Sequence, residues 1–162
     1  MTNNNNQQLN RRKTMERFYF VEYWENLQDG EYQAVTNFAL NKSKELNARL
    51  VYLCKQKKDC GIVLEKFLPN EALVKKLKND QEINIQGVTV TIESQITLRK
   101  QFVIAPRVYV VLYPSQDMMT VLEKPNTNAA AIIVFSEPQY AEHLFEWINK
   151  CNPNRLECQT TV

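Results

Sequence analysis

The residues of this sequence that could carry chemistry stand where apolar runs give way to polar side chains. The run over residues 129–135 ends in Ser136-Glu137-Pro138, and the run over residues 107–113 ends in Pro114-Ser115. Hydroxyl and carboxylate groups at such junctions can bind a ligand, because ligands of open α/β sheets bind beyond the carboxyl ends of the strands. Both junctions therefore predict a ligand site at one edge of a sheet.

Six residues make up the predicted ligand-binding set. Each follows a predicted strand or stands close to the start of the next helix: Lys55, Cys60, Tyr113, Ser115, Ser136 and Glu137. The two serines can also be read as helix N-caps, and Ser136 with Gln139 forms the S-x-x-Q pattern of a capping box. Cys60 follows Lys57 and Lys58, and basic neighbours at a helix start can activate a thiol. A buried, inert thiol is the alternative.

Established catalytic signatures are missing from the sequence. The chain has three glycines and contains neither G-x-S-x-G nor G-x-G-x-x-G nor a Walker lysine. His143 is the single histidine, and its place beside an apolar helical face predicts packing on Trp147 rather than catalysis. The four cysteines match no zinc-binding spacing and predict reduced thiols, so we expect neither a metal nor a cofactor. Enzymatic activity stays open, with a non-catalytic role favoured.

A stretch near the amino end, residues 14–27, is dense in aromatic side chains. Its apolar residues fit one helical face at i, i+3, i+4 and i+7, but aromatic residues also favour strands, so both structures stay open and the helix is preferred. Tyrosine and tryptophan are enriched at protein interfaces. The sequence therefore predicts a partner or dimer surface made by four residues: Phe18, Phe20, Tyr23 and Trp24.

Continuous apolar runs predict three buried strands, because strands covered on both faces lack polar alternation. The runs occupy residues 48–54, 107–113 and 129–135. Apolar residues at helical spacing predict helices over residues 31–47 and 71–79, the second capped by Asn70 and preceded by a shorter helix. The basic segment 55–61 is predicted as a loop.

Residues 83–98 change to a two-residue period. Isoleucine and valine alternate with polar residues there, and Gln86-Gly87 separates the two runs. Two polar residues ending in glycine between alternating runs indicate a tight antiparallel hairpin. We expect its second arm to reach Leu98.

Together these elements predict a single α/β domain. The sheet is mostly parallel, an antiparallel hairpin forms one edge, and helices cover both faces, as in a small Rossmann-like domain. The domain is expected over residues 14–152, between a disordered polar leader (1–13) and a C-terminal tail (153–162). A chain of 162 residues suits one domain with its own core.

Charge argues against binding to nucleic acid. The net charge is +2, but Arg11, Arg12 and Lys13 lie in the leader, and the rest of the chain has about as many basic as acidic residues. Nucleic-acid-binding domains concentrate positive charge on the folded surface, and here only residues 42–58 are locally basic. No window approaches roughly 20 consecutive apolar residues, so no membrane span is predicted. Without a secretory signal, a cytoplasmic location is expected.

The favoured function is therefore a non-catalytic accessory or regulatory module that acts through protein contacts, with a protein partner or a second copy. The alternative is a small enzyme or a nucleotide- or anion-binding domain that uses the carboxyl edge of the sheet. Nucleic-acid binding through residues 42–58 is the least favoured hypothesis.

Overall fold

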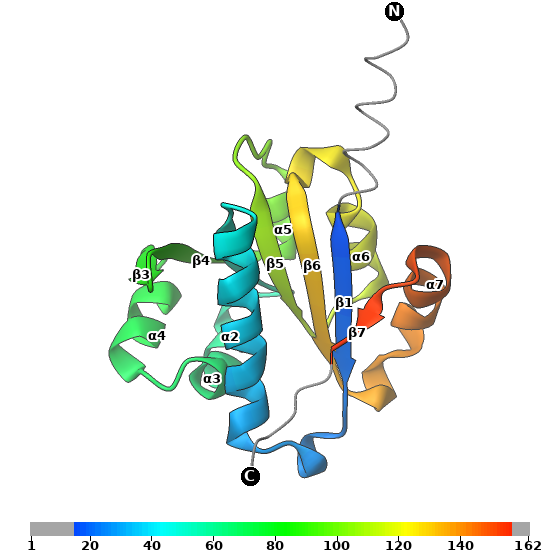
Figure 1. The fold of residues 1–162 in the computed structure, drawn as a ribbon, viewed down its shortest axis with the longest axis horizontal. Helices are drawn as coiled ribbons and strands as arrows, with labels where there is room; N and C mark the ends of the chain where they lie inside the picture. The colour runs from blue at the N-terminus through cyan, green and yellow to red at the C-terminus, as the bar shows by residue number, and fades with distance from the viewer. Residues whose placement is uncertain (1–14, 157–162) are drawn as a thin grey trace, which may run out of the picture.

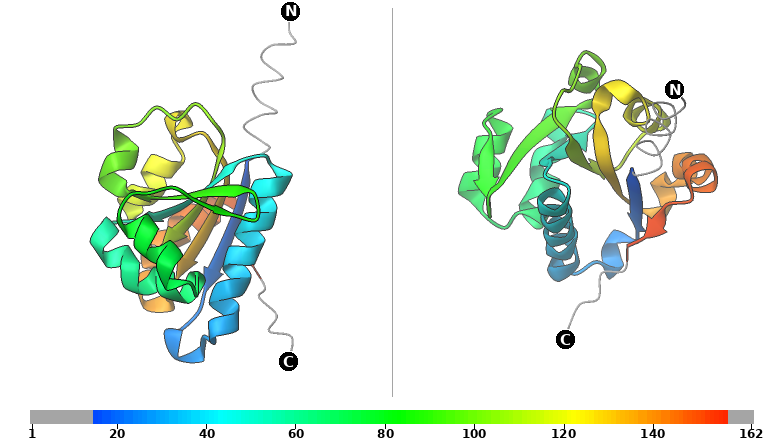
Figure 2. Two further views of the ribbon diagram at one scale, coloured as in Figure 1. Left: turned by 90° about the vertical axis from the view of Figure 1, so that its left-hand side faces the viewer. Right: turned by 45° about the horizontal axis from the view of Figure 1, so that its top comes forward.

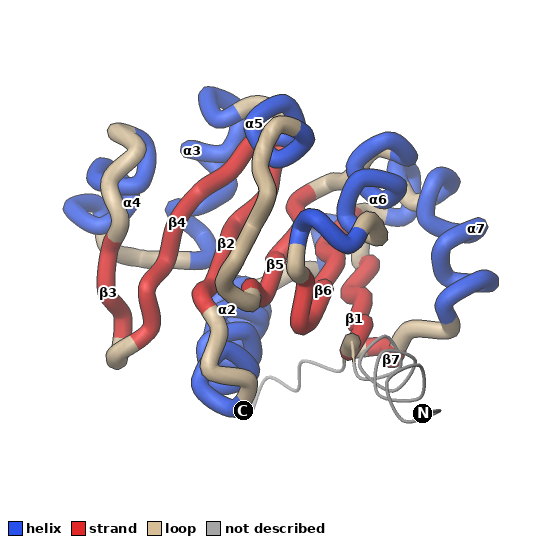
Figure 3. The backbone as a smooth tube through the Cα atoms, turned by 90° about the horizontal axis from the view of Figure 1, so that it is seen from above, coloured by secondary structure: helices blue, strands red, loops and turns tan. Residues whose placement is uncertain are grey.

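A computed structural model describes residues 15–156 of the chain, and this part forms one α/β domain (Figure 1). The whole of the predicted leader (1–13) and the end of the predicted tail, including Cys158, lie outside the described residues. The described part contains a seven-stranded sheet in the order β3-β4-β2-β5-β6-β1-β7, which Figure 3 shows from one edge to the other.

The strands pair in parallel, with one exception at the edge. Their bounds are β1 Glu16–Val21, β2 Arg49–Cys54, β3 Ile83–Ile85, β4 Val88–Ser94, β5 Arg107–Leu112, β6 Ala129–Ser136 and β7 Asn154–Arg155. β3 and β4 form an antiparallel hairpin, and every other neighbouring pair is parallel. The predicted fold class, a mostly parallel sheet with an antiparallel hairpin at one edge, is confirmed.

Three α-helices cover each face of the sheet in the described part (Figures 1 and 2). On one face lie α2 Asp29–Glu45, α3 Lys57–Phe67 and α4 Glu71–Lys78, and on the other lie α5 Gln95–Arg99, α6 Gln116–Leu122 and α7 Glu142–Cys151. Short 3-10 turns are η1 Trp24–Asn26, η2 Pro125–Thr127 and η3 Pro138–Tyr140. No helix within residues 15–156 is both long enough and apolar enough to cross a bilayer.

The core has two halves, one on each side of the sheet. In β2, Leu50, Tyr52 and Cys54 pack in the half beneath α2, α3 and α4, whereas Val51 and Leu53 pack beneath α5, α6 and α7. Each fully buried aliphatic side chain contributes about 1.5–3 kcal/mol relative to exposure. Burial on both faces explains why these strands appear in the sequence as unbroken apolar runs.

The aromatic segment near the amino end is a strand, so the preferred helix prediction is wrong. β1 pairs with β6 on one side and with β7 on the other, and Phe18 and Phe20 are each 9% exposed on the α2 face. Both are therefore core residues rather than a free interface. Of the other two predicted interface residues, Tyr23 is 47% exposed, and the side chain of Trp24 lies outside the described part.

Three further boundaries differ from the sequence predictions. The basic segment 55–61 is not a loop, because α3 begins at Lys57. The second hairpin arm ends at Ser94, which forms a capping box with Thr97 and starts α5. The sheet continues into the predicted tail, where β7 pairs with β1 and Leu156 is 7% exposed.

Candidate functional site

The carboxyl ends of β2, β5 and β6 lie at one edge of the sheet, because these strands are parallel neighbours. After β2 the chain enters α3 on one face, and after β5 it enters α6 on the other. A topological switch point therefore lies between β2 and β5, and a second lies between β6 and β1. Ligands of open α/β sheets bind at such points, and a ligand site at this edge stays a prediction.

Three of the six predicted ligand-binding residues come together at this edge. The backbone N–H of Tyr113 donates to the carbonyl of Phe135 at 2.9 Å, which places Tyr113 beside the end of β6. Ser136 is completely buried, and its hydroxyl donates to the carbonyl of Glu137 at 3.3 Å. Glu137 is 7% exposed. Tyr113 has a φ of 49°, a left-handed conformation that is uncommon for a bulky residue.

The other three predicted residues lie apart from one another. Lys55 is exposed just beyond β2. Cys60 is 2% exposed in the first turn of α3 and packs in the core half beneath α2. Ser115 caps α6 on the opposite face, where its hydroxyl accepts from the N–H of Met118 at 3.3 Å. Cys60 is therefore a buried thiol, as in the alternative interpretation, and Ser115 is a helix N-cap.

The predicted capping box at Ser136 does not form. Ser136 is the last residue of β6, and its carbonyl accepts from the N–H of Glu22 at 3.2 Å. A 3-10 turn from Pro138 follows, and α7 begins only at Glu142. The side chain of Gln139 donates instead to the carboxylate of Glu137 at 3.2 Å.

Aromatic rings fill the carboxyl edge on the α2 face. The ring of Phe135 lies 5.4 Å from Tyr32, 4.9 Å from Phe67 and 5.9 Å from Tyr113, measured between ring centroids. Phe20 stacks on the same ring at 5.5 Å. The edge is therefore a packed aromatic layer with polar groups at its rim.

Of the polar groups there, Tyr140 is 55% exposed and Tyr113 is half-buried, whereas Tyr32 and Glu137 are buried at 3% and 7% exposed. We call Tyr32, Tyr113, Tyr140 and Glu137 the tyrosine–glutamate cluster. The pKa of Tyr113 is raised to about 12, first by burial and then by Tyr32, Glu137 and Tyr140. The pKa of Tyr32 is also raised, by burial and then by the charges of Glu137, Asp29 and Glu31. Both phenols thus stay protonated at neutral pH. They can donate hydrogen bonds and offer ring faces, but they are poor nucleophiles.

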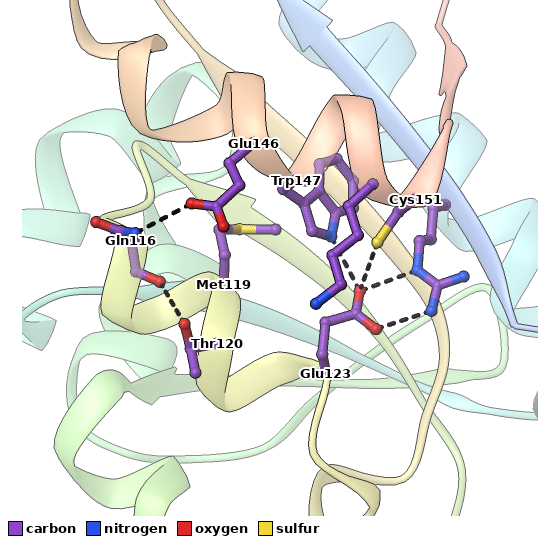
Figure 4. A pocket seen from close by; sticks show the side chains of 9 residues that line it. Gln116, Met119, Thr120, Glu123, Glu146, Trp147 and Cys151 are labelled. Atoms are coloured by element: carbon purple, nitrogen blue, oxygen red, sulfur yellow. Dashed lines mark hydrogen bonds and ion pairs between the residues drawn. The ribbon is translucent and has the colours of Figure 1, made fainter.

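A groove of about 500 Å³ lies on the other face, between α6 and α7 (Figure 4). In it Arg17 donates from Nε and Nη2 to Oε1 and Oε2 of Glu123, at 2.9 and 2.8 Å. The indole N–H of Trp147 donates to Oε1 at 2.9 Å, and the Cys151 thiol lies 3.9 Å from the same oxygen. The protein's own carboxylate therefore occupies the polar centre of the groove and joins β1, α6 and α7.

The electrostatics of the groove are those of a structural ion pair. Burial raises the pKa of Glu123, but the hydrogen bonds from Arg17 and Trp147 outweigh it, so the carboxyl pKa lies below its usual range. Burial and the negative charge of Glu123 raise the pKa of the Cys151 thiol. This thiol is therefore protonated and unreactive at neutral pH.

An apolar surface projects from the amino end of the sheet, in the connection from α5 to β5. Phe102 is 82% exposed and Ile104 is 87% exposed, while Val103 between them is 8% exposed. Ala105 and Pro106 are exposed as well. We call residues 102–106 the apolar loop.

Hydrogen bonds fix the backbone of the apolar loop. The N–H of Val103 donates to the carbonyl of Asn126 at 2.9 Å, and the side chain of Asn128 donates to the carbonyl of Ile104 at 2.8 Å. The side chain of Asn126 donates to the carbonyl of Gln101 at 3.1 Å. The loop is thus held in an extended form that turns Phe102 and Ile104 to the same side, toward water.

The sequence prediction missed several residues of these sites. Neither Tyr32 nor Tyr140 is among the predicted ligand-binding residues. The apolar loop stands directly before the predicted strand 107–113, and an apolar segment in that position carries no signal of exposure. Arg17 and Glu123 are 106 residues apart, and no local pattern joins them.

Comparison with known proteins finds no matching family model, no matching curated protein and no matching solved structure.

Proposed function

We propose that this domain is a non-catalytic binding module that contacts a protein partner through the apolar loop. The observation that carries the proposal is the exposure of Phe102 and Ile104, at 82% and 87%, on a backbone held by hydrogen bonds. Moving one such side chain out of water contributes about 1.5–3 kcal/mol. Two neighbouring apolar anchors of this kind can form part of the energetic centre of an interface.

The fixed backbone supports binding as well as exposure. A segment that is already ordered loses little conformational entropy when a partner binds, so more of the burial energy appears as affinity. Neighbouring apolar side chains that stay exposed promote non-specific association of a monomer. Their presence in the apolar loop is therefore better explained by a partner that covers them.

The charges around the apolar loop indicate the chemistry of the partner. Arg49 and Arg107 line the same shallow hollow as Phe102 and Ile104, and Lys100 is exposed beside it. Arg49 and Arg107 face Glu82 and Glu93, whereas Lys100 has no ion-pair partner within the described residues. The complementary partner surface is an apolar patch bordered by carboxylates.

Two other functions are less well supported by the geometry. An anion or nucleotide at the carboxyl edge would meet the carboxylates of Glu137, Asp29 and Glu31. The basic charge of residues 42–58 is partly neutralised: Lys42 pairs with Glu16 at 3.0 Å and with Glu45 at 3.1 Å, and Lys57 pairs with Asp80 at 2.8 Å.

The test compares wild type with a Phe102→Ser/Ile104→Ser double variant in quantitative affinity purification. Ile62→Ser is the matched control, because Ile62 is 77% exposed on α3, away from the loop. Wild type and the control should recover the same partner, and the double variant should lose it. Light scattering over a range of concentrations reports self-association in parallel. Equal recovery by the double variant, or a monomer that recovers no partner, contradicts the proposal.

A further inference from the structure

We propose that the tyrosine–glutamate cluster at the carboxyl edge binds a small organic cation, an alkylammonium group, with Glu137 as counter-charge and the rings of Tyr32, Tyr113 and Tyr140 as its walls. This site is separate from the apolar loop, which leads into the amino end of β5 at the other end of the sheet.

Glu137 is buried and forms no ion pair with any residue of the described part, 15–156. It continues β6 in an extended conformation (φ −101°, ψ 151°), so its side chain points to the same side as Phe135, two residues earlier. That side carries α2 and the aromatic layer. Within the described residues, the one hydrogen bond to its side chain comes from Gln139, and no basic group lies within 4.0 Å. A carboxylate that is 7% exposed normally has a charged partner.

Two tyrosine rings lie near enough to this carboxylate to respond to its charge. Tyr32 and Tyr113 both pack on Phe135, at 5.4 and 5.9 Å, and the charge of Glu137 contributes, after burial, to the raised pKa of both phenols. Tyr140 lies three residues after Glu137 and is 55% exposed. Ring faces next to a carboxylate bind ammonium groups through cation–π attraction, which strengthens as water is excluded.

A cation of the protein already uses one of these rings. The ammonium group of Lys66 lies 5.2 Å from the ring centroid of Tyr32. Lys66 is an exposed side chain of α3, so it can leave the ring when another cation binds. Tyr32 is 3% exposed, and the face that it presents to Lys66 is the one on which a positive charge lies.

The surrounding charge selects for the same ligand class. Asp29 and Glu31 stand in the first turn of α2, close enough for their charges to raise the pKa of Tyr32 after burial and Glu137. Among the charged groups named here, the carboxylates of Glu137, Asp29 and Glu31 thus outnumber the ammonium of Lys66. A phosphate would be repelled, whereas an alkylammonium group would gain from both the charges and the rings.

The ligand is tested as choline and tetramethylammonium, titrated into the full-length protein and followed by NMR. Choline methyl protons that lie over ring faces shift upfield in fast exchange. We expect a saturable upfield shift with a dissociation constant on the order of 1 mM. The uncharged isostere of choline, with carbon in place of nitrogen, should bind at least roughly tenfold more weakly, because it lacks the attraction to Glu137.

Variants separate this site from a general effect on folding. Glu137→Gln keeps the size and the fold but should weaken choline binding at least roughly tenfold. Glu142→Gln is the matched control, because this exposed carboxylate in the first turn of α7 should leave binding unchanged. Lys66→Gln should strengthen binding, since it removes the competing cation. The proposal is overturned if choline and its neutral isostere bind alike, or if Glu137→Gln and Glu142→Gln bind choline equally.

Discussion

Replacement of Glu123 by alanine should destabilise the domain far more than loss of a surface carboxylate. The carboxylate accepts two hydrogen bonds from Arg17 and one from Trp147 (Figure 4). The side chains of Arg17 and Glu123 are 21% and 28% exposed, so water screens the pair only in part. These bonds join β1, the end of α6 and α7, which are distant in sequence. Their loss should therefore weaken the packing of both helices on that face of the sheet.

The size of the effect follows from this geometry. A hydrogen bond to a charged group contributes about 1.5–3 kcal/mol, whereas an exposed ion pair contributes about 0–1 kcal/mol. For a bidentate pair that is one quarter exposed we assign about 1–2 kcal/mol, and for the indole bond about 1 kcal/mol. Glu123→Ala should therefore cost about 2–3 kcal/mol, which lowers the Tm of a domain of this size by about 4–12 °C.

Thermal and urea unfolding followed by circular dichroism measure this cost. Glu146→Ala is the matched control, because Glu146 lines the same groove but is exposed and accepts only a 3.3 Å bond from Gln116. The control should change the unfolding free energy by no more than about 0.5 kcal/mol. A double-mutant cycle of Glu123→Ala with Arg17→Met should give a coupling energy of at least about 1 kcal/mol. A cost equal to that of the control, or a coupling energy near zero, would refute the reasoning.

Three further outcomes can be measured by the same unfolding assays. From about pH 6 to pH 3, wild type should lose more stability than Glu123→Gln: burial raises the Glu123 pKa, but the hydrogen bonds it accepts depress it further, so its stabilisation is present above the unfolded-state pKa and disappears as pH falls through the folded pKa. Thr36→Val should cost about 1–3 kcal/mol, since the buried Tyr52 hydroxyl, 2.8 Å from Thr36, is left unpaired; a loss below about 0.5 kcal/mol would contradict this. Gly61→Ala should stabilise by about 0.5–1 kcal/mol, because alanine favours the helix and its methyl group meets only the flexible end of Lys78. Net destabilisation would show that Lys78 cannot move aside.

The central part of the fold could be predicted because its signals are local. Strands β2, β5 and β6 are buried on both faces, and each therefore appears as an unbroken apolar run. Asn70 and Ser115 stand at helix starts and accept from backbone N–H groups as caps should. Gln86-Gly87 lies in a turn of positive φ between the two hairpin strands, which ordinary turn chemistry predicts.

The amino-terminal strand was mispredicted because its sequence supports two periods. Phe18 and Phe20 point to one face, while Tyr19 and Val21 pack in the other half of the core. The same segment also fits helical spacing when it is extended to residue 27. A short aromatic segment cannot settle the period by itself. What decides the strand is pairing with β6, more than 100 residues away, and no local pattern records that contact.

Whether the carboxyl edge binds a ligand stays a prediction, but part of its make-up could be predicted. Parallel strands bring Tyr113 and Glu137 to one edge, and the unbroken apolar runs were sufficient to predict this. The ring layer around Phe135 also needs Tyr32 from α2, and α2 reaches that edge only because β1 lies next to β6. The incorrect helix prediction for β1 thus hid the aromatic side of the site.

The two proposed surfaces should act independently, since they lie at opposite ends of β5. Between them, Val108, Tyr109, Val110 and Val111 are fully buried. Coupling between distant sites requires an element with two discrete arrangements that both sites bias. Phe102→Ser/Ile104→Ser should therefore leave the choline-dependent NMR shift unchanged, and Glu137→Gln should leave partner recovery unchanged. If either variant stayed folded but lost both choline binding and partner recovery, the two surfaces would be coupled through β5, and the expectation of independence would be wrong.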